Sequence, residues 1–472
     1  MWSLSLMLKM IMLPTILSAA AVRLWNVYVT SSRDVTWHLP LPPGHFGIPF
    51  IGESFYMLFF RNLYLQRKRN AYGNIYVTHL FGNPTVRVCG AEYVRRILRG
   101  ENTLVETQWP LSTRLLLGEG SLSHARGLDH TVKKKALLKA FSSDALSSYV
   151  PVIQQITRKY IQQWIVRGRV SVCEEMKTLN FELALRVLLG ADLAAAEQRR
   201  LTHVFETFMW NLFCLPLDMP GSGLRKGRDA RNKLLAVIDE IIKTRQTQAP
   251  FEDRNSVLGY IQAAERAGSY THEEVKNLCL ELLFAGHGTT SSAGCSLVYY
   301  LAKRCDVREK VIAELQAHGL LGVGCDHVTL QQLNQLSYVN NVVKEVLRIS
   351  APIPGGFRRA LQTFEIGGYQ VPKGWSVTYD IHSTHGISGC SCDPAAFNPD
   401  CWNQASTPVA YMPFGGGRRS CAGKDLARIM LKVFVVEHVR GCSVRLLNER
   451  TRFQTFPMPY PTDGMPVNVT CL

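Results

Sequence analysis

A glycine-rich segment near the C-terminus, residues 414–423, constrains this chain more than any other part of its sequence. It reads Phe-Gly-Gly-Gly-Arg-Arg-Ser-Cys-Ala-Gly and contains Cys421. The glycines permit a tight turn and expose backbone N–H groups beside the sulfur. The amphipathic run from Lys424 to Val439 predicts a helix whose positive N-terminal end favours a thiolate. A buried structural cysteine is the alternative, but the whole pattern indicates a thiolate that ligates a haem iron and pushes electron density onto it.

The segment fits F-x-x-G-x-R-x-C-x-G, and Ala427 extends the match. This pattern resembles the haem-binding signature of the cytochrome P-450 superfamily. The resemblance implies a mainly α fold with small β-sheets, the cytochrome P-450 fold, in a single large haem-binding domain. It also implies haem b (iron protoporphyrin IX) as the cofactor, Cys421 as its iron ligand and Phe414 as a further haem contact. We expect small sheets over residues 74–88 and 364–377.

Length and composition agree with one large domain. The 472 residues contain no Pro-, Gly- or Ser-rich linker after residue 55. The thirteen cysteines lack paired spacing, which indicates reduced thiols in a cytosolic environment. We therefore predict an N-terminal membrane anchor over residues 1–23, a Pro-rich spacer over residues 24–44 and the haem-thiolate domain over residues 45–472.

The N-terminal 22 residues are almost wholly apolar apart from Lys9, Thr15 and a few serines, and Arg23 follows them. Such a segment is long enough to cross or nearly cross a bilayer. A cleaved signal peptide is the alternative, but a secreted domain with this many unpaired cysteines would be unusual. The sequence therefore predicts a retained anchor in the endoplasmic reticulum membrane, with the catalytic domain on the cytosolic side.

Residues 271–303 have the apolar periodicity of one long helix. Small side chains at Ala285 and Thr289 would let this helix pass close over a flat porphyrin, although close helix packing alone is the alternative. One face of the helix carries Leu278, Leu282, Ala285, Thr289 and Ser292. By the resemblance, Ala285 and Thr289 contact haem, and Thr289 is the catalytic residue that assists proton delivery.

The chain departs from the family pattern at Gly288, where the family has an acidic residue immediately before the threonine. Without that carboxylate, protons would have to arrive through water, His287 or Glu281. We therefore expect slower turnover, or less product formed for each electron pair consumed.

A second motif, Glu345-Val-Leu-Arg348, lies in the expected helix over residues 340–349. An isolated pair at this spacing is usually an ordinary surface ion pair. In the resembled family Glu345 and Arg348 would form a buried structural lock, completed by an arginine from a later segment. This chain has Cys401 at that later position, and a thiol cannot donate the forked hydrogen bonds of a guanidinium.

Haem propionates need cations beside them. By the resemblance these are Arg419 in the cysteine segment and Arg358 after Pro354-Gly-Gly-Phe357, together with His130 and Lys134. Each of these side chains taken alone could be an ordinary surface charge.

Long stretches of the chain are similar to the retinoic-acid-hydroxylating family of animal cytochromes P-450. The similarity is carried by residues 76–88, Trp109-Pro110, Asn211-Leu-Phe213 and residues 354–358. It implies an apolar substrate pocket, although each of these aromatic residues could equally belong to the core. The implied aromatic lining is Trp109, Phe213, Phe284 and Phe357. Arg87 and Arg114 are the candidates for a cation that binds the substrate carboxylate.

The formal net charge of +16 suits an anionic membrane surface or an acidic protein partner. We find no basic array interleaved with aromatic residues, so we predict no nucleic-acid partner. Two basic clusters lie in segments that, in the resembled family, border the face where an acidic reductase docks. They comprise Lys424, Arg428 and Lys432 in one segment and Lys133, Lys134, Lys135 and Lys139 in the other. A solvated basic face is the alternative for any one of these residues.

The expected activity is that of a monooxygenase (an oxidoreductase acting on paired donors). It would use NADPH electrons, delivered by an NADPH–cytochrome reductase, to hydroxylate a lipophilic acid, above all retinoic acid. Three alternatives remain open: another lipid or sterol monooxygenase, a haem-thiolate isomerase or dehydratase, and a catalytically weakened retinoid-binding paralogue.

Overall fold

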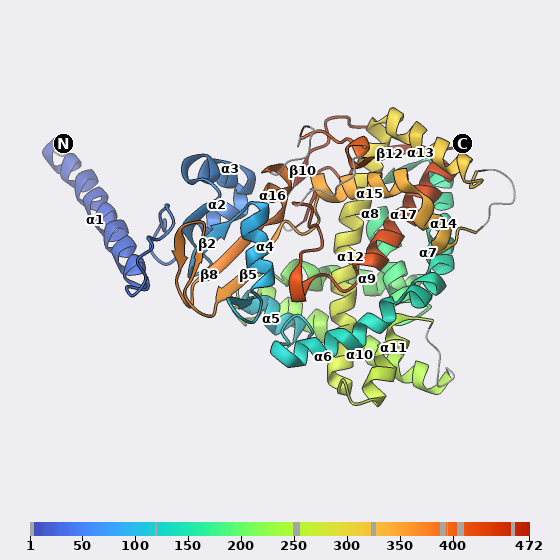
Figure 1. Cartoon of the computed structure of the whole chain (residues 1–472), viewed down its shortest axis with the longest axis horizontal. Coiled ribbons are helices and arrows are strands. Elements are labelled where there is room, and N and C mark those ends of the chain that lie inside the picture. The colour runs from blue at the N-terminus through green and yellow to red at the C-terminus, as the bar shows by residue number, and fades with distance from the viewer. Residues whose placement is uncertain are drawn as a thin grey trace. The chain divides into compact units, whose positions relative to one another are not determined.

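The computed structural model describes residues 4–118, 120–248, 255–321, 327–387, 393, 395–403, 410–454 and 458–472. The chain forms two compact units (Figure 1). Unit 1 comprises Met1–Gln108, Gly355–Ser388 and Gly416–Arg419, and unit 2 comprises Trp109–Pro354, Gly389–Gly415 and Ser420–Leu472. Each unit is therefore assembled from segments far apart in the sequence.

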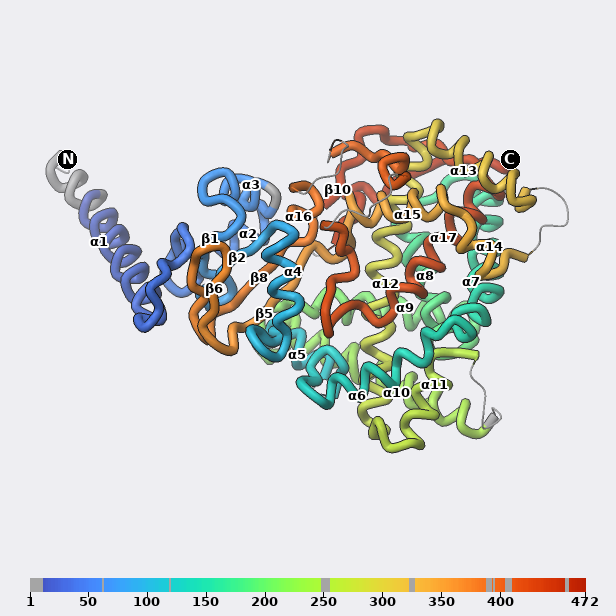
Figure 2. Tube along the Cα trace, viewed as in Figure 1, coloured from blue at the N-terminus to red at the C-terminus, as the bar shows by residue number. Residues whose placement is uncertain are grey.

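A five-stranded sheet forms the centre of unit 1. Blue and orange segments of the trace lie side by side in it (Figure 2), in the order β1-β2-β8-β5-β3. Its strands are β1 (Ile75–Leu80), β2 (Asn83–Val88), β8 (Ser376–Asp380), β5 (Gly355–Ala360) and β3 (Val105–Thr107). β2 pairs with β8 in parallel, and the other pairs are antiparallel. The hairpin of β6 (Phe364–Ile366) and β7 (Tyr369–Val371) completes the strands expected over residues 364–377.

Several helices accompany this sheet in unit 1. They are α1 (Leu4–Ser31), α2 (Ser54–Phe59), α3 (Arg61–Tyr72), α4 (Ala91–Arg99) and α16 (Ile381–Ile387). α1 continues into the residues expected as a spacer, because no proline or glycine interrupts residues 24–31. Within α1, residues Met12–Ser31 are long and apolar enough to cross a membrane, a property that a signal sequence near the N-terminus would share.

Unit 2 is mainly helical. Its helices are α5 (Leu111–Leu117), α6 (Gly127–Leu138), α7 (Ser143–Arg167), α8 (Val172–Leu183), α9 (Ala195–Asn211), α10 (Gly223–Gln248), α11 (Val257–Arg266), α12 (His272–Lys303), α13 (Cys305–Ala317), α14 (Leu330–Gln335), α15 (Ser337–Ile349) and α17 (Lys424–Gly441). Small sheets join β4 (Arg169–Ser171), β12 (Pro466–Cys471) and β9 (Cys442–Leu446), and β10 (Phe453–Gln454) with β11 (Tyr460–Pro461).

α12 is the longest of these helices and packs against α8, α10 and α17. A capping box starts it, in which Thr271 accepts a hydrogen bond from the Glu274 N–H and the Glu274 side chain accepts one from the Thr271 N–H. Residues 290–298 of this helix are all buried, as expected of a helical segment that packs on all sides. The expected helix over residues 271–303 and the expected mainly α fold with small sheets are confirmed.

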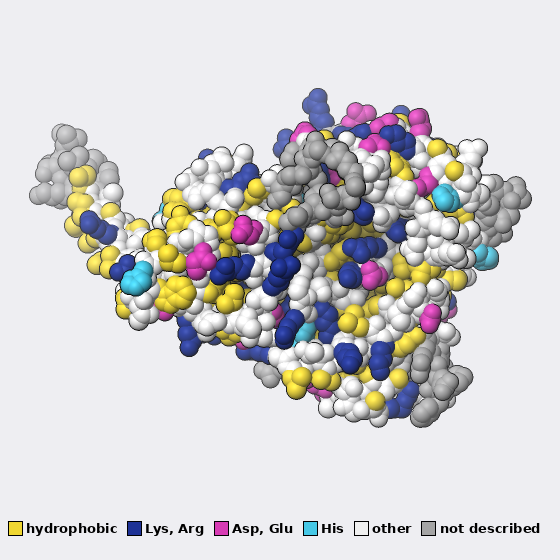
Figure 3. Space-filling model, in the orientation of Figure 1, with side chains coloured by type: hydrophobic (Ala, Val, Ile, Leu, Met, Phe, Trp, Pro, Cys, Tyr) yellow, Lys and Arg dark blue, Asp and Glu magenta, His cyan; other side chains and the backbone are white. Residues whose placement is uncertain are grey.

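The surface carries many cations, and dark blue Lys and Arg side chains are spread over the face in Figure 3. Two of the lysines predicted to be basic surface groups are buried instead. Lys432 donates to the Leu333 carbonyl, and Lys133 pairs with Asp129 and Glu274. Lys135, Lys139 and Lys424 remain exposed on α6, just after it, and on α17.

Candidate haem-thiolate site

The Cys421 segment closes on itself in unit 2, because the Cys421 N–H donates to the Phe414 carbonyl over 3.0 Å. The Cys421 side chain is exposed. Burial by the surrounding chain nevertheless raises the pKa of its thiol above the usual value. A hydrogen bond from the Gly423 N–H and the positive charge of Lys134 lower this pKa, but burial has the larger effect. A cysteine that is exposed as a residue and whose sulfur is near a backbone N–H and a cation would suit an iron ligand.

Gly417 shows why the segment needs glycine. Its φ is +64°, and a Cβ there would lie 2.1 Å from the carbonyl oxygen of Leu98, a neighbour in unit 1. Any other residue would combine an unfavourable backbone conformation with a steric clash.

Lys134 lies beside the ligand segment. Its Nζ donates to the Ser420 carbonyl over 2.5 Å and approaches the Ser420 Oγ at 3.4 Å. His130, one turn earlier on α6, is buried. The structure therefore places Lys134 in contact with Ser420, the residue that precedes Cys421. The contacts of His130 and Lys134 with the haem stay predictions.

α12 has an open face in the middle of a buried helix. Ala285 is exposed, Leu282, Gly286 and Thr289 are half-buried, and residues 290–298 are all buried. The Thr289 hydroxyl donates to the Ala285 carbonyl over 2.7 Å. A flat cofactor needs a surface of this kind, with small side chains and a polar group at one end.

Gly288 is held by packing from the C-terminal part of unit 2. A Cβ on this residue would lie 2.8 Å from Met458 Cε and 3.4 Å from Met209 Cε. The Tyr460 hydroxyl donates to the Gly288 carbonyl over 2.8 Å. Methionine side chains thus occupy the space next to the missing acid, and a glutamate at position 288 would have to displace Met458.

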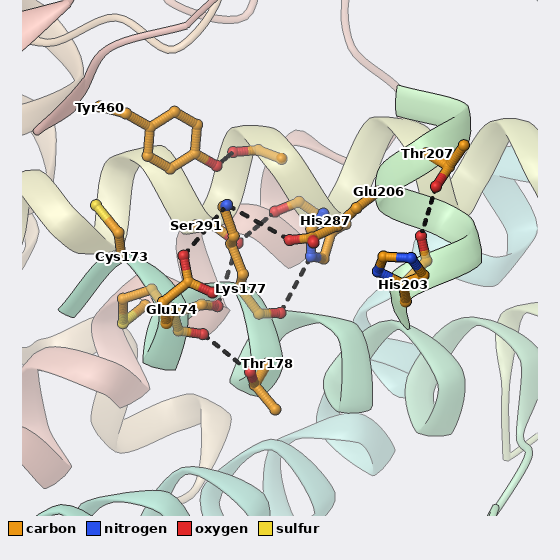
Figure 4. Close-up of polar contacts among 12 residues, drawn as sticks. Cys173, Glu174, Lys177, Thr178, His203, Glu206, Thr207, His287, Ser291 and Tyr460 are labelled. Carbon is orange, nitrogen blue, oxygen red and sulfur yellow. Dashed lines mark hydrogen bonds and ion pairs between the residues drawn. The ribbon is translucent and has the colours of Figure 1, made fainter. Parts of the chain in front are cut away.

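His287 does not extend the open face (Figure 4). Its Nε2 donates to the Lys177 carbonyl over 3.0 Å, and its ring lies edge-on to Phe181 and Phe205. Burial lowers the pKa of His287 to about 4, so the ring is neutral at pH 7. Its side chain is directed toward α8, which makes it a poor candidate for delivering protons at Thr289.

Glu281 lies one turn before Ala285, but its carboxylate is engaged elsewhere. It accepts backbone N–H groups from Leu122 over 2.6 Å and from Ser123 over 2.8 Å. These bonds fasten the segment after α5 to α12. Water therefore remains the proton source that requires no rearrangement of His287 or Glu281.

The lock predicted from Glu345 and Arg348 is present and buried. Arg348 donates from Nε and Nη2 to the two carboxylate oxygens of Glu345 over 2.8 and 2.9 Å. Arg348 also donates to the Ala396 carbonyl over 2.9 Å. The spacing that is usually a weak surface pair here forms a buried, bidentate ion pair.

Trp402 supplies the donor that the sequence lacks at Cys401. Its indole N–H donates to Glu345 over 2.9 Å, and the Asn398 N–H donates to the other carboxylate oxygen over 2.9 Å. Cys401 itself is disulfide-bonded, so the expectation of reduced thiols is wrong at this position, while nine other described cysteines are free. The sequence analysis missed Trp402, although a tryptophan adjacent to the altered position was a visible signal.

Replacing Trp402 tests this substitution of donors. In Trp402→Phe a buried carboxylate loses one hydrogen bond, so we expect a loss of about 1–3 kcal/mol of unfolding free energy. Denaturant unfolding followed by circular dichroism measures it. Trp210→Phe, at a site 74% exposed, is the matched control and should stay within about 0.5 kcal/mol of wild type. Equal stability of the two variants would show that the hydrogen bond from Trp402 to Glu345 does not stabilise the protein.

Unit 1 holds the two arginines predicted as propionate partners. Arg358 and Arg419 both approach Glu101, with Nε to carboxylate distances of 3.1 and 2.9 Å. All three side chains are buried. The sequence analysis did not single out Glu101, and no motif marks it.

Arg87 has a different partner from the one predicted. It lies buried in β2 and forms an ion pair with Asp380 over 2.8 Å, and Arg61 approaches the same carboxylate at 3.4 Å. Burial raises the pKa of Asp380, but the charges of Arg87 and Arg61 outweigh it and hold the pKa below its usual value. Because its guanidinium already pairs with Asp380, Arg87 is a poor candidate for binding the substrate carboxylate.

The remaining predicted substrate residues divide between the units. Phe357 lies in β5 of unit 1, with its ring 6.1 Å from that of Phe81. In unit 2, Trp109 and Phe284 are half-buried, and Phe213 and Arg114 are exposed. Their contact with substrate stays a prediction.

Comparison with known proteins shows the family of the chain. Residues 42–461 match the family described as Cytochrome P450. The chain is 44% identical to Cytochrome P450 26A1 of Gallus gallus over 96% of its own length and 95% of that protein. It is 40% identical to Cytochrome P450 26B1 of Homo sapiens over 96% of its length and 91% of that protein. Among solved structures, a retinoic acid bound cyanobacterial CYP120A1 is 33% identical, with a TM-score of 0.84 over 92% of this chain and 100% of that one.

The chain therefore belongs to the cytochrome P450 family, and its fold and enzyme class are those of a cytochrome P450 monooxygenase. The family implies a haem, electrons from a redox partner and a lipophilic substrate. The residues present fit a haem, because unit 2 offers an exposed cysteine and the open face of α12. Within unit 1 taken by itself, two buried guanidiniums share the Glu101 carboxylate.

Proposed function

We propose that this protein hydroxylates retinoic acid, with Cys421 as the iron ligand of haem b. The observation that carries the proposal is the exposed residue Cys421 in its glycine-rich segment. The substrate is supported by a structural relative that is 33% identical and is described as retinoic acid bound. Similarity at 44% and 40% identity to Cytochromes P450 26A1 and 26B1 over nearly the whole chain supports the same function.

A thiolate-ligated haem supplies the oxygen-activating chemistry when it is bound. Thr289 supplies a hydroxyl on the open face of α12. A hydroxyl that donates to the Ala285 carbonyl can still accept a hydrogen bond from water. Thr289 can therefore hold a water molecule at its Oγ, which compensates in part for the carboxylate missing at Gly288.

The substrate pocket that we propose is apolar, as a polyene requires. Trp109, Phe213, Phe284 and Phe357 would contact the chain of the substrate. Arg114, exposed on α5, is the remaining candidate for its carboxylate. For the cofactor we propose that Arg358, Arg419, His130 and Lys134 contact the propionates and that Phe414 packs near the haem.

We propose that the protein is anchored by α1 in the endoplasmic reticulum membrane, with the catalytic part in the cytosol. Exposed aromatic side chains of unit 1 support contact with lipid, namely Phe50, Phe55, Phe59 and Phe60. We further propose an NADPH–cytochrome reductase as the redox partner. The exposed cations Lys135, Lys139 and Lys424 of unit 2 support an acidic partner of this kind.

Incubation with an NADPH–cytochrome reductase, NADPH and all-trans retinoic acid tests the activity. We expect hydroxylated retinoic acid that forms only when NADPH and oxygen are both present. A substrate-induced spin shift without product would favour the retinoid-binding alternative, and product from a lipid peroxide without NADPH would favour the isomerase. Turnover of another lipid or a sterol, with none of retinoic acid, would contradict the proposed substrate.

Thr289→Val tests the role of the hydroxyl while it keeps the side-chain shape. We expect product formed per NADPH consumed to fall about tenfold or more, up to the ~10²-fold typical of one proton-transfer group. Thr290→Val is the matched control, because Thr290 is buried beside the open face. If both variants couple NADPH to product as well as wild type does, Thr289 has no part in proton delivery.

A further inference from the structure

Glu101 has an unusual environment for a carboxylate that the family motifs do not mark. It lies in unit 1 between α4 and β3, and the residue is only 2% exposed. Its Oε1 accepts hydrogen bonds from the Thr107 N–H over 3.3 Å, the Thr107 hydroxyl over 3.1 Å and Arg419 Nε over 2.9 Å. Removing a charged carboxylate from water costs several kcal/mol, so its partners must offset that cost.

The other carboxylate oxygen is less well satisfied. Glu101 Oε2 lies 3.1 Å from Arg358 Nε, yet neither atom makes a hydrogen bond within the part of the chain that the structure describes. The two groups attract each other as charges but are not aligned as donor and acceptor. Arg358 is held elsewhere, by a hydrogen bond from Nη1 to the Phe357 carbonyl over 2.8 Å and by the Tyr379 ring 5.3 Å away.

The three side chains of this cluster bring two positive charges to one negative charge. Two guanidiniums and one carboxylate leave a net charge of +1, and every side chain involved is at most 8% exposed. Both arginines approach Glu101 through Nε, over 3.1 Å for Arg358 and 2.9 Å for Arg419. Each guanidinium carries further N–H donors on its two Nη atoms. Without Glu101 the two buried guanidiniums would repel each other at close range.

We propose that Glu101 is a positioning residue for the anionic edge of the cofactor. It holds Arg358 and Arg419 together by their Nε atoms, so that their remaining N–H donors form a cationic site for the haem propionates. This inference rests on the proposed haem site. It goes beyond that site because Glu101 would act through the two arginines and not touch the haem.

The test is the rate at which the haem-loaded full-length protein transfers haem to excess apomyoglobin. We expect Glu101→Gln to lose haem about tenfold faster, the low end of what removing a supporting partner of a metal site costs. Glu101→Asp, which keeps the charge, should lie between Glu101→Gln and wild type. Glu92→Gln, the same change at an exposed position of unit 1, should match wild type.

A second background separates positioning from folding. In Arg358→Gln/Arg419→Gln protein, adding Glu101→Gln should change the rate by less than about twofold, because the groups it positions are gone. A tenfold acceleration that persists there would mean that Glu101 acts through stability alone. Haem loss from Glu101→Gln that is unchanged or slower than wild type would also overturn the proposal. If Glu101→Gln does not fold, Glu101→Asp in the two backgrounds gives the same comparison.

The outcome for the haem site itself is read separately. Wild-type protein that takes up no haem, or shows no thiolate-type spectrum with carbon monoxide, overturns the proposed function and this inference with it. A normal wild-type spectrum combined with unchanged haem transfer in Glu101→Gln overturns the inference alone.

Discussion

Cys421→Ser should abolish the thiolate-type Soret band of the reduced carbon monoxide complex and reduce retinoic acid hydroxylation by more than about a hundredfold. Serine retains the approximate size of the side chain, but it has no sulfur and its hydroxyl is not ionised at neutral pH. It therefore cannot replace the thiolate that pushes electron density onto iron. The glycine-rich segment and the Cys421 to Phe414 backbone bond should persist, so the protein should still fold. Difference spectroscopy and product assay with reductase measure the two effects.

The matched control is Cys305→Ser, the same change at another free and exposed cysteine of unit 2. It should leave both the spectrum and the activity at wild-type values. A Cys421→Ser protein that keeps the thiolate-type band would mean that another cysteine ligates the iron, and the assignment of the site would be wrong.

Glu345→Ala should cost about 3–5 kcal/mol of unfolding free energy, the range for breaking a buried ion pair. Three donors then lose their acceptor, namely the Arg348 guanidinium, the Trp402 indole N–H and the Asn398 N–H. The free energy of unfolding of a native protein is typically only about 5–15 kcal/mol, so this loss would remove a large part of it. Denaturant unfolding measures the loss, and we also expect poor haem retention.

Glu174→Ala is a matched control at the same i,i+3 spacing. Glu174 is 69% exposed and lies 3.7 Å from Lys177, an arrangement worth at most about 1 kcal/mol. A Glu345→Ala protein no less stable than Glu174→Ala would show that the buried lock contributes nothing to stability.

Several site residues could be predicted from sequence because their chemistry is local. The segment around Cys421 encodes its turn through glycines, and the Glu345 to Arg348 spacing puts both side chains on one helix face. The long helix around Thr289 follows from its apolar period and its capping residues. In each case the residues that define the feature lie within a few turns of one another, so sequence distance and spatial distance agree.

Other features depended on contacts between residues distant in sequence. The sequence predicts Arg87 as a substrate cation, because nothing near it in the sequence shows that Asp380 forms an ion pair with it. Trp402 and Asn398 replace a missing arginine by reaching Glu345 from more than fifty residues away. The packing of Met458 against Gly288 could not be predicted from the sequence either, because it depends on how the C-terminal part of the chain folds back.

The sequence by itself determined the helical class of the fold, the family and the presence of a Glu345 to Arg348 pair, and it predicted the iron ligand. Only the tertiary structure decided which charges are already paired, how the lock survives without its arginine, and that Arg358 and Arg419 share Glu101. The physical reason is that ligand type and periodicity are properties of short segments. Burial and charge compensation depend on which distant segments the fold brings into contact.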